Sequence, residues 1–290
     1  MEVLITGSSG FIGSYFCANE TRFLLRKFDS SIRINGACDS NSTLQKEIGG
    51  CDTVLHLAGL AHKSYTDQQL DDVNHLGTLQ LAGLAANAGV KRFVFVSTVN
   101  VLGGASFSLP LTENVSYEKS INESKRQAEV SLQKIGRETG MEITIIRPVL
   151  VYGKDAPGNM GLLVKIASRL PFTPFGLVNN KRSFISIDNL CDFISLCIYH
   201  PKAANEVFLI SDDHTVSTPE FMNSVVGGLG QNTRHLPIPV WIIRFMGKLF
   251  GISKQVEQLV GDLEVNCSKA KKLLGWTPLE TMAQSMAKLK

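Results

Sequence analysis

The sequence contains no long uncharged apolar run and no long block of cations. A membrane span needs ~20 consecutive apolar residues. No uncharged apolar stretch of this chain approaches that length, so we expect no membrane span. Lysine and arginine number 29 against 26 aspartate and glutamate residues, and no run of cations exceeds two residues. This balance argues against nucleic acid as a partner, because such proteins carry a strong positive field, and it suits a small anionic ligand better.

Closely spaced cysteine pairs are also missing. The six cysteines show no CxxC spacing and no cluster with histidine; they are Cys17, Cys38, Cys51, Cys191, Cys197 and Cys267. We therefore expect no metal site, and free, buried thiols in a reducing compartment. Met1 leads directly into an apolar strand pattern, which leaves no room for a signal peptide. The expected location is the cytoplasm.

The chain has 290 residues, 44% of them hydrophobic and 19% charged, as in an ordinary globular protein. Apolar runs alternate with helical patterns along its first half. The runs predict strands over residues 3–6, 23–26, 32–37, 53–57, 92–97 and 142–147, and the patterns between them predict helices over 12–18, 44–48, 67–88 and 122–140. This alternation is typical of an α/β protein with a doubly wound parallel sheet.

The alternation ends at Tyr152-Gly153 and gives way to loops rich in Gly, Pro and Asn. We therefore predict a dinucleotide-binding domain over residues 1–153 and a smaller C-terminal substrate-binding lobe, mainly over 154–290. A late strand and helix near 183–200 are expected to return to the first domain.

Three signals organise the C-terminal lobe. Ser217-Thr218-Pro219-Glu220 predicts a capped helix start, and Gly275 predicts a helix end. The apolar segment 239–252 carries only two cations. We interpret it as a helix packed in this lobe, rather than as a helix lying in a membrane interface.

The motif with most chemical content follows the first strand, where Gly7, Gly10 and Gly13 are spaced as GxxGxxG at the start of a helix. Gly7 permits the sharp turn, Gly10 lets the backbone approach a pyrophosphate, and Gly13 allows close packing of the helix on the sheet. The helix N-terminus attracts phosphate. The motif therefore predicts a dinucleotide site.

The chain resembles the extended short-chain dehydrogenases/reductases, and within them the nucleotide-sugar epimerases, dehydratases and 4-ketoreductases. The motifs that carry the resemblance are residues 6–13 (TGSSGFIG), Asp39, 56–59 (HLAG), 74–78 (NHLGT), 95–98 (FVST), 124–129 (SKRQAE), Arg147-Pro148, 151–153 (VYG) and 274–278 (LGWTP). The resemblance implies NAD or NADP across the carboxyl edge of the sheet and a nucleoside-diphosphate sugar between the two lobes.

The resemblance also assigns residues. Those implied to bind the cofactor are Gly7, Ser9, Gly10, Phe11, Ile12, Asp39, Leu57, Ala58, Gly59, Asn74, Lys125 and Pro148. Thr98 occupies the position of the catalytic hydroxyl and contacts the sugar. Lys125 is implied to hydrogen-bond the nicotinamide ribose and to lower the pKa of the neighbouring acid/base. The lone histidines His56 and His62 we interpret as structural.

One departure from the family pattern concerns the proton donor. The family has Tyr-x-x-x-Lys, and here Ile121 stands four residues before Lys125. Isoleucine cannot transfer a proton. Three explanations remain open: Tyr117 acts from one turn earlier if the helix extends that far, water or Thr98 relays the proton, or the chain is a poorly active or engineered variant.

Phosphate contacts are suggested at three further positions. Arg26-Lys27, at the end of the second strand, favours the 2′-phosphate of NADP over NAD. In the C-terminal lobe, Asn159 and Arg182 resemble the family's diphosphate contacts, and an arginine fork suits a phosphate.

The leading functional hypothesis is an NAD(P)-dependent 4-epimerase of the UDP-glucose or UDP-N-acetylglucosamine type, acting through a transient 4-keto sugar. The alternative is an NADPH-dependent 4-ketoreductase of a UDP- or dTDP-4-keto-6-deoxy sugar. A third hypothesis, motivated by Ile121, is a catalytically impaired nucleotide-binding protein of the same fold. A homodimer is a further expectation.

Overall fold

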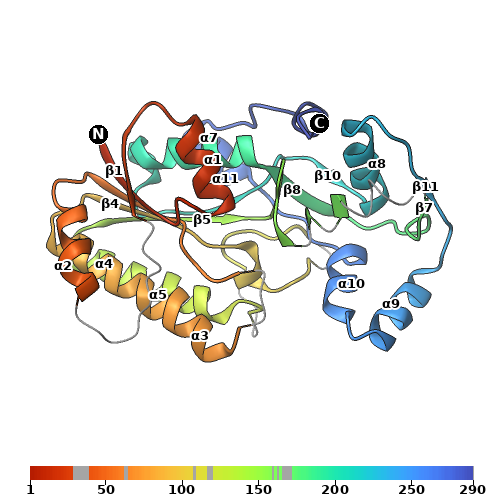
Figure 1. The fold of residues 1–290 in the computed structure, drawn as a ribbon, viewed down its shortest axis with the longest axis horizontal. Coiled ribbons are helices and arrows are strands. Elements are labelled where there is room, and N and C mark those ends of the chain that lie inside the picture. Colours follow the sequence, from red (N-terminus) through yellow and green to blue (C-terminus); the bar gives the residue numbers. More distant parts are fainter. Residues whose placement is uncertain are drawn as a thin grey trace.

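The computed structural model describes residues 1–28, 39–61, 65–106, 109–115, 120–158, 160–161, 163–164 and 172–289. Its main element is a six-stranded parallel sheet in the order β2-β1-β3-β4-β5-β9 (Figure 1). The strands are β1 (Glu2–Thr6), β2 (Leu24–Phe28), β3 (Thr53–His56), β4 (Arg92–Val96), β5 (Glu142–Pro148) and β9 (Val207–Ile210). This sheet confirms the predicted α/β class. The strand predicted over 32–37 lies outside the described residues.

The strands are apolar on both faces because the sheet is covered on both sides. Successive side chains of a strand point to opposite faces. Accordingly, Val3 and Ile5 join one hydrophobic cluster while Leu4, between them, joins the other. In β4 all five residues are buried. These near-continuous apolar runs are what a parallel sheet with two helical layers requires.

The helices form these two layers (Figure 1). One layer contains α2 (Asp39–Ile48), α3 (Asp67–Asp71), α4 (Gly77–Asn87) and α5 (Glu123–Thr139), and the other contains α1 (Phe11–Asn19), α7 (Ile187–Tyr199) and α11 (Ser268–Leu274). The helix predicted over 67–88 is built from α3, a π-helical turn η1 (Asp72–Leu76) and α4, joined end to end.

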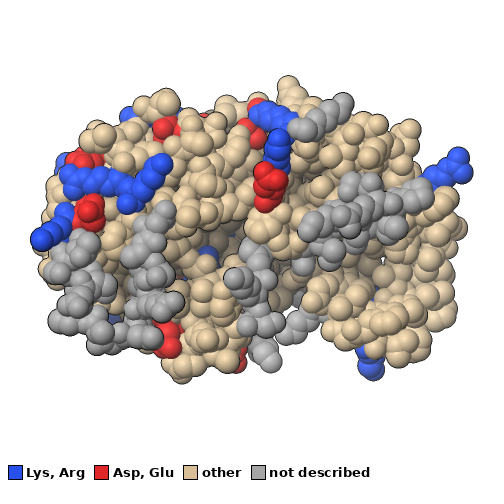
Figure 2. Space-filling view, in the orientation of Figure 1, with Lys and Arg blue, Asp and Glu red and all other residues tan. Residues whose placement is uncertain are grey.

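The sheet order places a crevice where the chain changes direction. From β1 the chain passes to β2 on one side, and it later returns to β3 on the other side. Ligands of open α/β sheets bind beyond the carboxyl ends of the strands at such a point. These ends face the second lobe in Figure 1, and the face shown in Figure 2 is hollowed near its middle.

The second lobe has a small sheet of its own, in which β8 (Arg182–Ser186) lies between β6 (Leu150–Tyr152) and β10 (Thr215–Val216). The strand expected near 183 to return to the first domain is this β8, so that expectation is wrong. The strand that does return is β9, and the helix after β8, α7, packs on the main sheet as expected.

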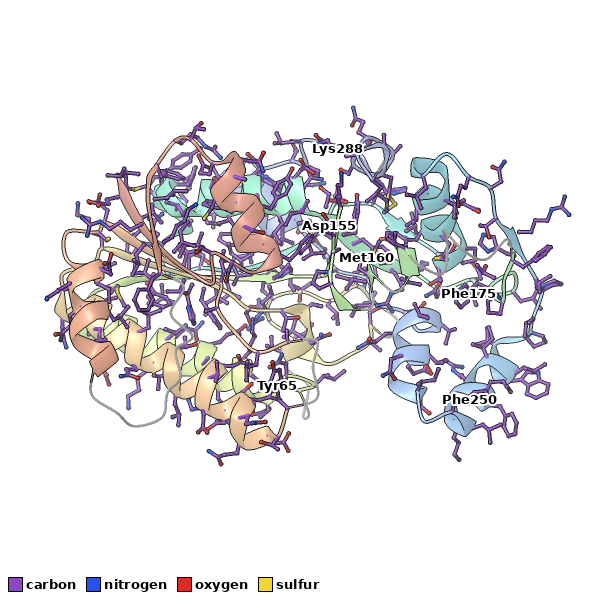
Figure 3. All side chains as sticks on the ribbon, viewed as in Figure 1. Tyr65, Asp155, Met160, Phe175, Phe250 and Lys288 are labelled. Carbon is purple, nitrogen blue, oxygen red and sulfur yellow. The ribbon has the colours of Figure 1, made fainter. Side chains whose placement is uncertain are left out.

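The rest of the lobe consists of short elements around a third apolar cluster, which includes Met160 and Phe175 (Figure 3). These elements are β7 (Phe172–Thr173), β11 (Arg234–His235), α8 (Thr218–Gly228), α9 (Val240–Leu249), α10 (Ser253–Val260) and α12 (Met282–Ala287). Two 3₁₀ turns occur elsewhere in the chain: η2 (Val99–Leu102) follows β4, and η3 (Pro201–Ala203) follows α7. The predicted capping box of Ser217 and Glu220 opens α8, and Gly275, at φ +68°, ends α11. None of the helices in the described part of the chain has the length and apolar character needed to cross a membrane.

Candidate active site

The loop between β1 and α1 is shaped by its glycines. Gly7 has φ +76°, and a Cβ there would lie 2.6 Å from the backbone nitrogen of Ala58. A Cβ on Gly13 would lie 2.1 Å from the carbonyl oxygen of Gly7. These two glycines are therefore required by the backbone itself, because any side chain would collide with it.

Gly10 differs, because a Cβ there would have a single close neighbour and would not overlap the backbone. The nearest atom to a Cβ there is the Gly7 carbonyl oxygen at 3.3 Å. Gly10 is also the N-cap of α1 and provides no side-chain acceptor for the first N–H groups of the helix. Close by in sequence, the buried hydroxyl of Ser8 has no hydrogen-bond partner among the described residues. Unsatisfied donors around an open backbone surface fit the diphosphate of a dinucleotide.

The loop after β3 forms the facing wall, and Asn74 holds it. Asn74 Oδ1 accepts from the Leu60 N–H at 2.7 Å, and Asn74 Nδ2 donates to the Leu60 carbonyl at 3.2 Å. A Cβ on Gly59 would lie 3.0 Å from Asn74 Oδ1. Asn74 projects from the π-helical turn η1, and such turns occur often at functional sites. The wall of Ala58 and Gly59 is therefore fixed by a residue of the helical layer.

Lys125 reaches this site from the first turn of α5. Its Nζ donates to the Val96 carbonyl at the end of β4 (3.0 Å) and lies 5.6 Å from the centre of the Phe95 ring. A Cβ on Gly59 would be 3.6 Å from Lys125 Cε. Burial lowers the pKa of Lys125 to about 8. Because burial removes water from this ammonium group, it is suited to stabilise negative charge on a bound ligand.

Two hydroxyl groups follow Val96. Thr98 Oγ1 accepts from the Asn100 N–H at 3.3 Å and caps η2, which leaves its own proton free to be donated. Ser97 is buried, and its Oγ has no partner within the described residues. Ser97 was not singled out from the sequence, although it belongs to the motif that identified Thr98.

Ile121 does not lie on the α5 helix. The helix begins at Glu123, with Asn122 as its N-cap. Ile121 is 59% exposed, and its Cδ1 would lie 2.1 Å from a Cβ on Gly104. The helical extension that would carry Tyr117 to the face of Lys125 is therefore interrupted before residue 122. Tyr117 itself lies outside the described residues.

The side chain of Arg26 makes its contacts at the amino ends of the strands, away from the carboxyl ends where the glycine loop lies. Its guanidinium pairs with Glu2 and donates to the carbonyls of Glu47 and Gly49 at the end of α2. Glu2 starts β1 and Thr6 ends it, a separation of about 13 Å along the strand. Arg26 therefore points toward the amino ends of the strands, and these contacts do not support the prediction that it binds the cofactor. Its hydrogen bonds to the C-terminal carbonyls of a helix explain the position.

Arg182 is a buried cation in the second lobe. It is only 4% exposed, its Nη1 donates to the Gly261 carbonyl at 2.9 Å, and burial lowers its pKa to about 10. Within the described ranges it forms no ion pair with a carboxylate. Asn180 reinforces the same segment, because its Nδ2 donates to the carbonyls of Leu259 and Gly261. Sequence reasoning missed Asn180.

The other candidate residues are distributed around the same edge. Phe11 and Ile12 open α1 and pack on the first apolar cluster, and Phe11 approaches Gly153, where the lobes meet. Pro148 ends β5, and Leu57 follows β3. Asn159 and the side chain of Asp39 lie outside the described part of the chain.

His56 is structural, as interpreted from the sequence. Its ring is buried and hydrogen-bonds the hydroxyls of Thr6 (2.6 Å) and Thr78 (2.9 Å). Burial, with a smaller effect of Lys125, lowers its pKa to about 3. A neutral histidine with two partners has no group left for catalysis.

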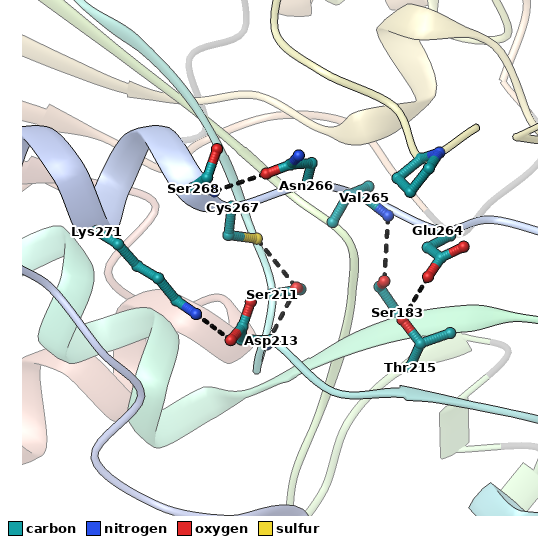
Figure 4. A pocket seen from close by; sticks show the side chains of 11 residues that line it. Ser183, Ser211, Asp213, Thr215, Glu264, Val265, Asn266, Cys267, Ser268 and Lys271 are labelled. Atoms are coloured by element: carbon teal, nitrogen blue, oxygen red, sulfur yellow. Dashed lines mark hydrogen bonds and ion pairs between the residues drawn. The ribbon is translucent and has the colours of Figure 1, made fainter.

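A separate pocket of about 260 Å³ lies between β8, β10 and the start of α11 (Figure 4). Its polar side chains bond to one another. Lys271 pairs with Asp213, Thr215 donates to Glu264 at 3.2 Å, and Ser211 lies 3.0 Å from the Cys267 sulfur. Among its described lining residues this pocket offers no unpaired cation, unlike the site at Lys125. Nor do the described residues contain a group of His, Cys, Asp or Glu able to hold a metal ion.

Comparison with known proteins identifies the family of this chain. Residues 3–211 match the NAD dependent epimerase/dehydratase family. The UDP-glucose 4-epimerase of Vibrio cholerae is 36% identical over 98% of this chain and 92% of its own length. The UDP-glucose 4-epimerase of Thermotoga maritima, solved with UDP-glucose, has a TM-score of 0.76 at 21% identity, covering 100% of this chain and 97% of that one.

A third similar structure, RMD from Pseudomonas aeruginosa, was solved with NADPH and has a TM-score of 0.73 at 18% identity, covering 100% of this chain and 98% of that one. These two solved structures show the fold, and the sequence matches show the family. The chain is an enzyme of the NAD dependent epimerase/dehydratase family.

Proposed function

We propose that this enzyme is a sugar-nucleotide 4-epimerase of the UDP-glucose 4-epimerase type. The main observation is that the buried Lys125 ammonium reaches the Val96 carbonyl at the carboxyl end of β4, two residues before Thr98 in the chain, with its Cε beside Gly59. The 36% identity to the Vibrio cholerae enzyme, over almost all of both chains, supports this assignment.

The residues that would hold a nicotinamide dinucleotide are those of the glycine loop, with Gly10 at the phosphates, and the wall of Ala58 and Gly59. When bound, the nicotinamide supplies a hydride acceptor and donor. The preference for NADP that Arg26 suggested is not supported by the contacts of Arg26 with Glu2 and α2. We propose a nicotinamide dinucleotide without preference between NAD and NADP.

Thr98 and Lys125 would act on the sugar. In this proposal the Thr98 hydroxyl takes the proton of the sugar's C4 hydroxyl while giving its own proton to a water molecule, and the reverse transfer returns a proton to the C4 oxygen when the keto group is reduced. Lys125 stabilises the negative charge that develops on that oxygen, an effect that is strong where water is excluded. Tyr117 remains the alternative acid/base.

Arg182 would meet the diphosphate of the substrate, with Asn159 as the second predicted contact. A buried guanidinium without a carboxylate partner among the described residues is costly. An anionic ligand offsets that cost. Asn180 would act indirectly, by holding the loop that carries Gly261.

The decisive experiment is to incubate purified protein with UDP-glucose, without added dinucleotide, and to measure UDP-galactose. We expect conversion to an equilibrium mixture, and release of a nicotinamide dinucleotide when the protein is denatured. The Lys125→Met variant should lose most of the turnover. Stoichiometric oxidation of added NADPH by a 4-keto sugar nucleotide, with no epimerisation, would replace the epimerase with a ketoreductase. Dinucleotide binding without turnover on any sugar nucleotide would indicate an impaired enzyme.

A further inference from the structure

Helix α9 exposes an unusually apolar face. Trp241, Phe245 and Leu249 are spaced four residues apart, so they lie on one side of the helix. They are 69%, 61% and 66% exposed. Three neighbouring apolar side chains extend the same surface, so that the α9 face consists of Trp241, Phe245, Met246, Leu249, Phe250 and Ile252. Isolated exposed apolar residues are ordinary, but six within twelve positions form a contiguous patch.

The opposite side of α9 accounts for its attachment to the lobe. Val240 and Ile243 pack on the third apolar cluster, and Gly247 is buried, with a Cβ there falling 2.6 Å from Val256. The helix is thus held on one side only and lies at an outer corner of the molecule (Figure 1), with Phe250 at its margin (Figure 3). The prediction of a helix packed in this lobe is confirmed for that inner side alone.

Cations outnumber carboxylates around the α9 face, where Glu257 pairs with Arg244 and Lys248 forms no ion pair within the described residues. From residue 221 to residue 256 the sequence contains no aspartate or glutamate, but it contains four cations: Arg234, Arg244, Lys248 and Lys254. Lys248 lies seven residues after Trp241 and is exposed at the edge of the apolar stripe. Arg244 lies beside it and pairs with Glu257 at 2.7 Å. In Figure 2 this region shows only uncharged and blue groups.

We propose that the α9 face docks on the surface of an anionic phospholipid membrane. The aromatic and aliphatic side chains would enter the boundary between headgroups and acyl chains, while Lys248 stays with the lipid phosphates. A second copy of the chain fits less well. A two-fold contact through α9 would bury Lys248 of both copies, and this cation forms no ion pair among the described residues that could neutralise it, since the nearby Glu257 pairs with Arg244.

The two tryptophans provide a direct test. Trp241 belongs to the α9 face, whereas Trp276 is 4% exposed and donates to Asp192 at 2.9 Å. We expect vesicles of phosphatidylglycerol and phosphatidylcholine in equal parts to shift the tryptophan emission to shorter wavelength and to sediment the protein. The Trp241→Phe variant should still sediment but lose the emission shift. Vesicles of phosphatidylcholine alone should bind much less.

A triple variant, Trp241→Ser with Phe245→Ser and Leu249→Ser, should lower the affinity for the anionic vesicles by more than about tenfold. Lys248→Glu should weaken it as well. The matched control removes two equally exposed leucines elsewhere, Leu24→Ser and Leu279→Ser, and should bind as the wild type. Thermal unfolding of every variant verifies that the fold is kept.

Three results would overturn the proposal. Wild-type protein could remain in solution with anionic vesicles. The triple variant, while still folded, could bind them as the wild type does. Finally, sedimentation velocity could show a wild-type dimer that the triple variant converts to a monomer, with no vesicle binding, in which case the α9 face is a subunit interface.

Discussion

Substitutions at two glycines of the loop after β1 should distinguish an effect on ligand binding from an effect on folding. A side chain at Gly10 meets only the Gly7 carbonyl, at 3.3 Å, whereas one at Gly13 collides with the same atom at 2.1 Å. We expect Gly10→Val to abolish dinucleotide binding while the protein melts within a few degrees of the wild type. Gly13→Ala should lower the melting temperature markedly. Calorimetric titration with NAD and NADP provides the measurement, and unchanged affinity in Gly10→Val would remove the dinucleotide site from this loop.

The isoleucine before α5 allows the missing acid/base to be tested. Ile121→Tyr places a phenol beside Gly104 and four residues before Lys125, whose cation would favour the phenolate if the new side chain reaches it. We expect turnover to rise by a factor on the order of 10²–10⁴, the usual contribution of a positioned acid/base. Tyr117→Phe, assayed in parallel, should lose a similar factor only if Tyr117 is the working acid. If neither change alters turnover, proton transfer runs through Thr98 or water.

The start of α5 places Lys125, and a single side chain defines that start. Asn122 Oδ1 accepts from the Lys125 N–H and from the Ser124 hydroxyl, each at 3.3 Å. Asn122→Ala should destabilise the protein by about 1 kcal/mol and should also reduce turnover, because the first turn that carries Lys125 frays.

The N-cap of α12 provides the matched control for that variant. Thr281→Ala removes the hydroxyl that accepts from Gln284 N–H, at the other end of the chain. It should cost a similar amount of stability in urea denaturation without changing turnover. Equal loss of turnover in both variants would mean that the Asn122 effect is only a loss of stability.

The acid stability of the whole molecule should depend on His56, which joins β1, β3 and α4 through Thr6 and Thr78. In the unfolded chain a histidine takes a proton near pH 6.5, whereas His56 in the folded protein has a pKa of about 3. The unfolded state therefore binds the extra proton between these values, and stability falls as the pH drops from about 6.5 toward 3.

Urea denaturation at pH 7 and pH 5 measures this effect. The wild type should lose stability between the two, and His56→Gln, though less stable at pH 7, should lose less. His235, a partly exposed histidine whose pKa is also lowered, chiefly by burial, gives the control variant His235→Gln. If His56→Gln keeps the full wild-type difference, the acid sensitivity originates elsewhere.

Much of the architecture could be predicted from local pattern. Helix α5 runs between Asn122 and Gly140, the two ends of the helix predicted over 122–140, and α8 opens with the predicted box of Ser217 and Glu220. The glycine loop was recognisable because Gly7 adopts φ +76° and Gly13 packs against the Gly7 carbonyl, six residues earlier in the chain. Such features depend on steric contacts and hydrogen bonds between residues close together in the chain, so they can be predicted from the local sequence.

What depends on distant partners was decided only by the tertiary structure. Arg26 was predicted to face a phosphate, but its partners are Glu2 and the end of α2. The strand returning to the main sheet is β9 rather than β8, because apolar strand patterns do not state which neighbour they pair with. Arg182 is buried by a segment some eighty residues later. Local periodicity specifies which face of an element is apolar; which residues meet across that face depends on packing of the whole chain.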